Sequence, residues 1–122
     1  MASRSEGEPS HPGESLAAVS RSIGSLHRRY YGKGPTESKS YLLDDTVLCI
    51  LRGGFTTVEE TLIADGKARE VEAMRRSFQR TMRARFVEVV ESQLEREVIG
   101  YMTQIHTEPD VAIEVFLLAP QE

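Results

Sequence analysis

A helix followed by two apolar strands occurs twice in this chain, and this repeat constrains the fold more than any other feature. The first copy has strand patterns over 39–43 and 46–52, joined at Asp44-Asp45. The second has strand patterns over 98–105 and 111–118, joined across residues 106–110. Apolar runs bounded by Asp, Pro and Gly are typical of β-hairpins. Because each hairpin supplies an antiparallel pair, the two copies predict one four-stranded antiparallel sheet.

Three helices are predicted around these hairpins. Residues 14–31 form the first, with apolar residues at spacings of three and four. A short helix, capped by Thr56 or Thr57 with Glu59 or Glu60 completing a capping box, runs to about Ala64. A long helix follows over 67–97. Its apolar residues recur at three and four: Val71, Met74, Phe78, Met82, Phe86, Val89 or Val90, and Leu94. The predicted fold class is therefore α+β: two αββ units in the order α-β-β-α-α-β-β, with helices covering the sheet.

The length and composition fit one small soluble domain. Residues 1–13 are rich in Ser, Glu, Pro and Gly, which predicts a disordered N-terminal tail, and 14–122 form a single α+β domain. The net charge of −4 makes a broad nucleic-acid or membrane footprint unexpected. Cys49 is the only cysteine, which excludes an internal disulfide and favours a reducing cytoplasm. No apolar run reaches the ~20 residues of a membrane span, so any membrane association is expected through a partner.

The apolar pattern also predicts self-association. The strands carry apolar residues on both faces, whereas the helices conveniently cover one face only. The other face then needs a partner, and we expect a homodimer or a larger homo-oligomer.

Two glycine loops are candidate anion sites. Lys33-Gly34 lies in a glycine-rich turn, and Arg52-Gly53-Gly54 precedes a predicted helix N-terminus. Free backbone N–H groups beside a cation can bind a phosphate or carboxylate. The alternative interpretation is structural, since a helix stop and a strand-to-helix turn explain the same glycines.

Four arginines of the long helix form a candidate partner surface, which we call the arginine stripe: Arg69, Arg76, Arg80 and Arg83. They fall within a roughly 60° arc at 100° per residue. Such a stripe could bind an acidic partner, nucleic acid or anionic headgroups, or it could simply be a solvated helix face.

The residues of the predicted turns do not suggest an enzyme. His106 and Asp110 flank the second turn, and Asp44-Asp45 form the first. Carboxylates with a histidine can ligate a metal or perform acid–base chemistry, but turn chemistry alone explains these aspartates. We therefore expect no catalytic residues, no metal and no cofactor.

Several strings together resemble a known bacterial domain: Tyr31-Gly32-Lys33-Gly34-Pro35, Tyr41 with Asp44-Asp45, Leu51-Arg52-Gly53-Gly54-Phe55-Thr56, Arg76-Ser77-Phe78, Gly100, and His106-Thr107-Glu108-Pro109-Asp110 before Glu114-Val115-Phe116. The sequence is similar to the MpsC-like family over roughly Leu16 to Leu118. That name stands for a domain linked to a sodium-translocating, membrane-potential-generating system. The resemblance implies a small soluble protein associated with membrane partners that carry the transport, and it supplies no catalytic residues.

The leading hypothesis is a non-enzymatic, cytoplasmic accessory or regulatory protein, associated with a membrane bicarbonate or cation transport system. One alternative is a sensor that binds a small anion or metabolite between the glycine loops. A second alternative is a nucleic-acid-associated regulator that uses the arginine stripe, although the net charge makes nucleic acid an unexpected partner.

Overall fold

The computed structural model describes residues 12–121 as three helices and one four-stranded sheet. The helices are α1 (Pro12–Tyr31), α2 (Thr57–Ala64) and α3 (Ala68–Leu94), and the strands are β1 (Glu37–Leu43), β2 (Thr46–Arg52), β3 (Val98–His106) and β4 (Val111–Leu118). The predicted tail over 1–13 lies outside the described residues except for its last two, with which α1 begins. The predicted α+β class and element order are confirmed.

The sheet is antiparallel throughout, with strand order β1-β2-β4-β3. The two hairpins are therefore joined by pairing of β2 with β4, which lie at the centre of the sheet. The register places Cys49 opposite Glu114 and Leu51 opposite Ala112. Because side chains alternate between faces, this register puts one set of residues from both strands under the helices.

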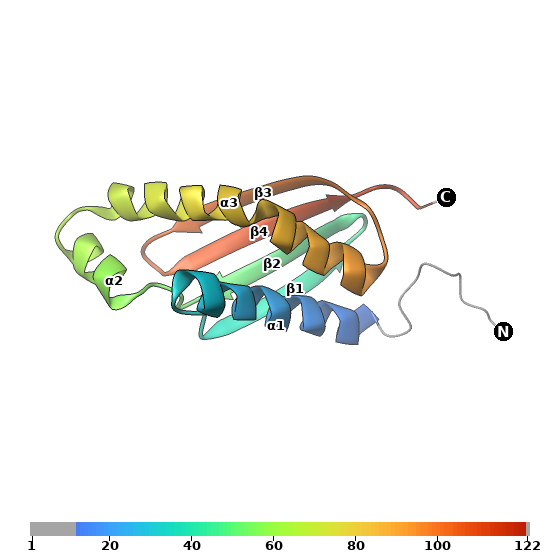
Figure 1. Cartoon of the computed structure of the whole chain (residues 1–122), viewed down its shortest axis with the longest axis horizontal. Helices are drawn as coiled ribbons and strands as arrows, with labels where there is room; N and C mark the ends of the chain where they lie inside the picture. The colour runs from blue at the N-terminus through green and yellow to red at the C-terminus, as the bar shows by residue number, and fades with distance from the viewer. Residues whose placement is uncertain (1–11, 122) are drawn as a thin grey trace.

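Helices α1 and α3 lie on the same face of the sheet, and the opposite face is left open (Figure 1). The core fills the space between these two layers. Its fully buried side chains come from both helices and from the two central strands: Val19, Ile23, Val47, Cys49, Val71, Phe86, Val90 and Phe116. One face of β2, carrying Val47, Cys49 and Leu51, is thus buried under the helices.

The buried stripe of α3 differs from the predicted one. Met74 was expected in the apolar stripe but is 53% exposed, whereas Arg75 and Gln79 are buried. The stripe actually runs through residues spaced by three and four: Val71, Arg75, Gln79, Met82, Phe86, Val90 and Leu94. Two polar side chains therefore lie in the interior, and each needs a polar partner there.

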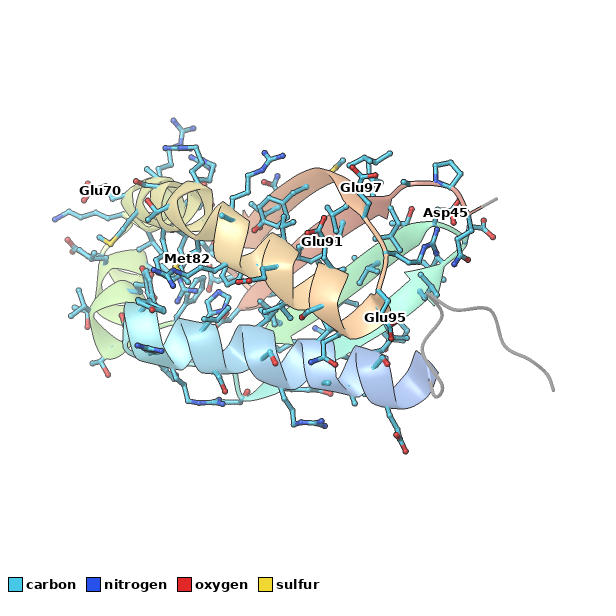
Figure 2. All side chains as sticks on the ribbon, turned by 45° about the vertical axis from the view of Figure 1, so that its right-hand side comes forward. Asp45, Glu70, Met82, Glu91, Glu95 and Glu97 are labelled. Carbon is cyan, nitrogen blue, oxygen red and sulfur yellow. The ribbon has the colours of Figure 1, made fainter. Side chains whose placement is uncertain are left out.

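At the other end of α3, polar contacts fix the passage into β3. Figure 2 shows Asp45, Glu91, Glu95 and Glu97 in this region. Glu91 accepts a hydrogen bond from the backbone N–H of Val98 at 2.9 Å, and Arg96 donates to Asp45 at 2.7 Å. Glu91 therefore helps to hold the α3–β3 connection, and Asp45 ties the β1–β2 turn to it through Arg96.

Gly53, between β2 and α2, has a structural reason to be glycine. Its φ of +70° lies in the left-handed region, and a Cβ there would collide with the side chain of Thr36. Gly66 has a similar φ of +78°, but open space surrounds the position of its missing Cβ. Replacing Gly66 would therefore introduce backbone strain alone, whereas replacing Gly53 would add a steric collision to the strain.

We predict that Gly66→Ala lowers the free energy of unfolding by about 1 kcal/mol, the usual cost of a left-handed non-glycine residue. Gly53→Ala should cost about 2 kcal/mol or more, because the collision with Thr36 adds to the strain. Urea unfolding monitored by circular dichroism measures both values. Equal losses for the two variants would contradict the steric role of Gly53.

Candidate functional site

A buried ion pair lies where α2 and α3 meet the end of α1. Arg75 binds Glu59 through two hydrogen bonds, of 2.8 Å from Nε to Oε2 and 2.7 Å from Nη2 to Oε1. Arg75 also donates to the carbonyl of Gly54 at 2.6 Å, and the hydroxyl of Tyr31 donates to Glu59. The guanidinium lies 4.1 Å from the centroid of the Tyr31 ring.

Helix α2 presents Glu59 to this arginine because its first turn is capped. The Thr56 hydroxyl accepts from the backbone N–H of Glu59, and the Glu59 carboxylate accepts from the N–H of Thr56. This is the predicted capping box, here completed by Glu59. The same carboxylate thus caps its helix and holds Arg75.

The ion pair remains charged at neutral pH. Burial acts to raise the pKa of Glu59, but hydrogen bonds from Arg75, Tyr31 and Thr56 outweigh it, and the net shift is downward. Burial also acts to lower the pKa of Arg75, but the Glu59 carboxylate outweighs it. Because the pKa of folded Glu59 is depressed, the pair stabilises the fold above the unfolded pKa. That contribution is lost as the pH falls through the folded pKa.

The predicted anion residues lie in two different places. Lys33 donates to the carbonyl of Phe55 at 2.9 Å and shares with Gly54 a cavity of about 10 Å³, room for a single water. Arg52 lies in a separate surface hollow beside Glu37 and Lys39, on the open face of the sheet. The structure therefore brings Lys33 and Gly54 together but places Arg52 elsewhere. Anion binding by these residues stays a prediction.

The other two predicted loop residues make structural contacts. Gly34 is buried, and a Cβ there would collide with the side chain of Arg28. The N–H of Gly53 donates to the carbonyl of Asp110 at 3.2 Å, and the Asp110 carboxylate accepts from the N–H of Phe55 at 2.9 Å. Asp110 thereby ties the second hairpin to the loop before α2.

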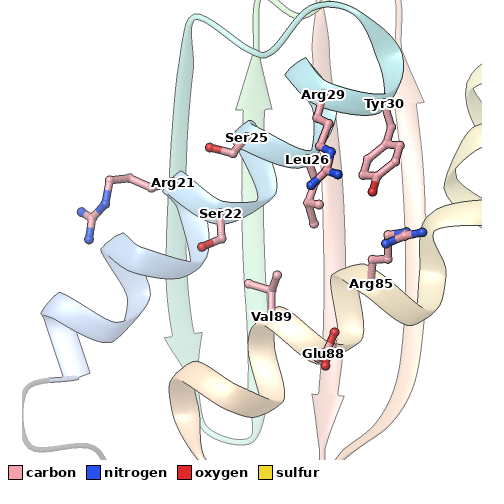
Figure 3. Close-up of a pocket in the computed structure, with 9 residues that line it drawn as sticks. All are labelled: Arg21, Ser22, Ser25, Leu26, Arg29, Tyr30, Arg85, Glu88 and Val89. Atoms are coloured by element: carbon pink, nitrogen blue, oxygen red, sulfur yellow. The ribbon is translucent and has the colours of Figure 1, made fainter.

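The arginine stripe is exposed along its whole length. On the other side of α3, facing α1, the two helices border a groove of about 520 Å³ (Figure 3). Its lining includes Arg21, Arg29, Arg85 and a single acidic residue, Glu88. The guanidinium groups of Arg29 and Arg85 both lie over the ring of Tyr30, at 5.1 and 4.7 Å from its centroid. The helical layer is therefore basic, although the chain carries a net charge of −4.

A second buried polar cluster lies between α1, α3 and the sheet. Glu114 in β4 and His27 in α1 are 0% and 2% exposed, and their nearest charged-group atoms are 3.9 Å apart. Around them lie the hydroxyl of Tyr101 and the amide of Gln79, whose carbonyl accepts from Thr103. The sequence offered one signal for this cluster, because Glu114 alone interrupts the apolar pattern of its strand. His27 gave none beyond its position one turn after Ile23.

Burial determines how the groups of this second cluster titrate. It raises the pKa of Glu114 to about 8, and the Tyr101 hydroxyl offsets only part of that effect. It lowers the pKa of His27. Burial likewise raises the pKa of Tyr101 above its usual value and that of Cys49 to about 12. Near neutral pH all four groups are therefore uncharged.

Among the residues of the two predicted turns, Asp45 and Asp110 bind other elements, whereas His106 makes a local contact. His106 contacts the carbonyl of Pro109 through Nδ1 at 2.9 Å, within its own turn. Over residues 12–121, no three His, Cys, Asp or Glu side chains gather in a way that could hold a metal ion. In the same part of the chain, no helix has the length and apolar character needed to cross a membrane.

Comparison with known families gives one match. The family described as "Na+-translocating membrane potential-generating system (MpsC)" matches residues 12–120, which is nearly all of the chain. No curated protein and no solved structure matches it.

We predict that Glu59→Gln lowers the free energy of unfolding by about 3 kcal/mol or more, because it leaves the charge of Arg75 buried and unpaired. A glutamine can still complete the capping box, so the loss of stability measures the effect of breaking the ion pair. Lys67→Ala is the matched control: it breaks the exposed Asp65–Lys67 pair and should cost at most about 1 kcal/mol. Urea unfolding at pH 7 measures both, and similar losses would contradict the role of the buried pair.

Proposed function

Because this chain belongs to the MpsC family, we propose that it is a non-enzymatic accessory protein of a membrane-potential-generating system, acting through protein–protein association. The observation that carries the proposal is the open face of the sheet, which the helices leave uncovered (Figure 1). Most of the side chains that the strands place on this face are apolar. A soluble domain rarely leaves such a surface exposed unless it is a binding surface. A reducing compartment such as the cytoplasm suits its lone buried thiol, Cys49.

We define the open sheet face by its apolar residues from all four strands: Tyr41, Leu43, Leu48, Ile50, Met102, Ile113, Val115 and Leu117. The register aligns them in rows across the sheet. One row runs from Tyr41 through Leu48 and Val115 to Met102. Both edge positions of this row are exposed. Aromatic residues and methionine are also the types enriched at protein interfaces.

A second copy of the chain is the occupant that this face fits best. Its charges gather at one end and include both signs, with Glu37 beside Lys39 and Arg52. Two copies related by a two-fold axis can therefore pair Glu37 of one protomer with a cation of the other. Four strands of about eight residues span roughly 500 Å² in plane, before the projecting side chains are counted. A typical stable interface buries about 800 Å² per partner, which is of the same order.

Such a dimer would leave the basic helical layer exposed. The arginine stripe and the groove between α1 and α3 then remain free to bind an acidic segment of another protein. Concentrated positive charge steers and orients acidic partners even when the net charge of a protein is negative. We therefore assign self-association to the sheet and partner binding to the helices.

We expect the wild-type chain to be a dimer at low micromolar concentration and Met102→Lys to shift it toward the monomer. A lysine at this exposed β3 position of the open sheet face would be desolvated on association without a partner charge. Met74→Lys is the matched control, since Met74 lies on α3 and is 53% exposed, as Met102 is. It should remain dimeric. Light scattering after size-exclusion chromatography measures both masses, and a monomeric wild type would refute the dimer.

The accessory role predicts that the tagged chain, expressed in its native host, recovers a membrane transport protein from solubilised membranes. The double variant Arg80→Glu with Arg83→Glu should recover at least several-fold less, because it reverses charge in the arginine stripe. Lys67→Glu, a single reversal at an exposed site outside the stripe, should recover amounts near wild type. Quantitative mass spectrometry measures the three yields. Recovery of no transport protein by the wild type would count against the accessory role.

A further inference from the structure

The second buried cluster is unusual because its central groups lack partners. Five of its side-chain atoms have no hydrogen-bond partner among the described residues: His27 Nε2, Gln79 Nε2, the Tyr101 hydroxyl, and Glu114 Oε1 and Oε2. Buried polar atoms are seldom left in this condition, because each such atom costs free energy. Both oxygens of one carboxyl group are unpartnered here, in contrast to the fully bonded carboxylate of Glu59.

The hydrogen-bond pattern fixes the tautomer of His27. Its Nδ1 lies 2.9 Å from the backbone carbonyl of Ile23. A carbonyl can only accept, so Nδ1 must carry the hydrogen. In the neutral ring Nε2 then has a free lone pair. Nε2 is also the ring nitrogen closest to Glu114, at 3.9 Å from Oε2. The ring is also stacked on Phe86, which restricts its reorientation.

An acceptor lone pair facing a carboxyl group requires a hydrogen between them. If both groups were deprotonated, two lone pairs would face each other inside the protein. One proton removes this conflict, whether it sits on the carboxyl group and is donated to Nε2 or sits on Nε2 and is donated to the carboxylate. The separation of 3.9 Å between Nε2 and Oε2 is about 1 Å longer than a hydrogen bond, so a shared proton implies that the two groups draw together when it is bound.

No other charged group competes for this position. The groups that face the carboxyl group or its histidine come from every surrounding element: Cys49 from β2, Tyr101 and Thr103 from β3, and Arg75 and Gln79 from α3. Arg75 is the cation whose charge acts on His27, but Glu59 already holds it with two hydrogen bonds. Arg83 lies outside the cluster, 5.8 Å from the Tyr101 ring centroid.

We propose that Glu114 and His27 form a buried proton-binding site, in which one shared proton joins α1 to the central strand of the sheet. The ligand is the proton itself, and the site is separate from the open sheet face and from the arginine surfaces. Loss of the proton would leave a buried carboxylate opposite a lone pair and weaken the contact of α1 with the sheet. The stability of the fold then depends on pH near neutrality.

The direction of this dependence follows from the two shifts. Burial raises the pKa of Glu114 to about 8. The stability that depends on the protonated carboxyl group is therefore fully present below the unfolded pKa and is lost as the pH rises through about 8. The pKa of His27 is lowered, so below its usual value of about 6.5 the unfolded chain takes up the compensating proton. Below about pH 6.5 the two effects therefore oppose each other. Stability should therefore fall mainly between about pH 6.5 and 8.

The test is urea unfolding of the full chain from pH 5.5 to 9, comparing the wild type with Glu114→Gln. For the wild type, the unfolding constant should rise roughly tenfold per pH unit between about 6.5 and 8, as expected for one proton bound only in the folded state. Glu114→Gln should lose this rise, because glutamine is isosteric and does not titrate. Glu88→Gln, an exposed glutamate of α3, should keep it.

A second measurement does not depend on how the variant folds. The side-chain carboxyl carbon of Glu114, followed by NMR in the wild-type chain, should titrate above pH 7, whereas exposed glutamates titrate near pH 4. Titration of Glu114 near pH 4 would overturn the proposal. A Glu114→Gln profile that keeps the wild-type rise would also overturn it.

Discussion

The pairing of β2 with β4 is the constraint on which the rest of the structure depends. It joins the two hairpins into one sheet and places two apolar strands at the centre, where each has a neighbour on both sides. Their side chains then need cover on both faces of the sheet. Helices α1 and α3 supply that cover on one face only, so the open face and the buried polar cluster are both consequences of the same pairing.

The interior treats its two buried carboxyl groups in opposite ways. Glu59 is surrounded by donors and stays ionised, because Arg75, Tyr31 and Thr56 replace the water it has lost. Glu114 is buried completely and has only the Tyr101 hydroxyl to oppose the effect of burial, so the neutral form is favoured. Arg75 cannot serve both groups, since one guanidinium already satisfies Glu59. The polar core is therefore divided into a fully paired half and a half that relies on one proton.

The fold could be predicted from the sequence because its signals are local. Alternating apolar residues and the turn at Asp44-Asp45 gave β2 with the bounds that the structure has, and the capping box at Thr56 gave the start of α2. The interior polar groups could not be predicted in this way. Arg75 falls on the buried stripe only because Glu59, sixteen residues earlier, turns inward to meet it. Helical periodicity alone suggested that Met74 fills that face.

The candidate sites show the same limit. Lys33 and Arg52 each lie beside glycines in the sequence, and this similarity suggested that the two loops form one anion site. Arg52 continues the alternation of Ile50 in β2, however, and so faces away from the helices toward the open side. Lys33 lies in the loop after α1, whose direction depends on contacts with Phe55 that no local pattern encodes. The sequence carried a clearer signal for Glu114, since it is the one charged residue in an otherwise apolar strand pattern.

The β2–β4 pairing also has a consequence for how the chain reaches its structure. Each hairpin needs only neighbouring residues, whereas the central pairing must wait until α2 and α3 have been made and folded back. During synthesis the first half therefore emerges with β2 as an unpaired apolar edge. Such an edge is a template for pairing with other chains. The interval before β4 arrives is thus the stage at which nascent chains are most exposed to aggregation and most dependent on chaperones.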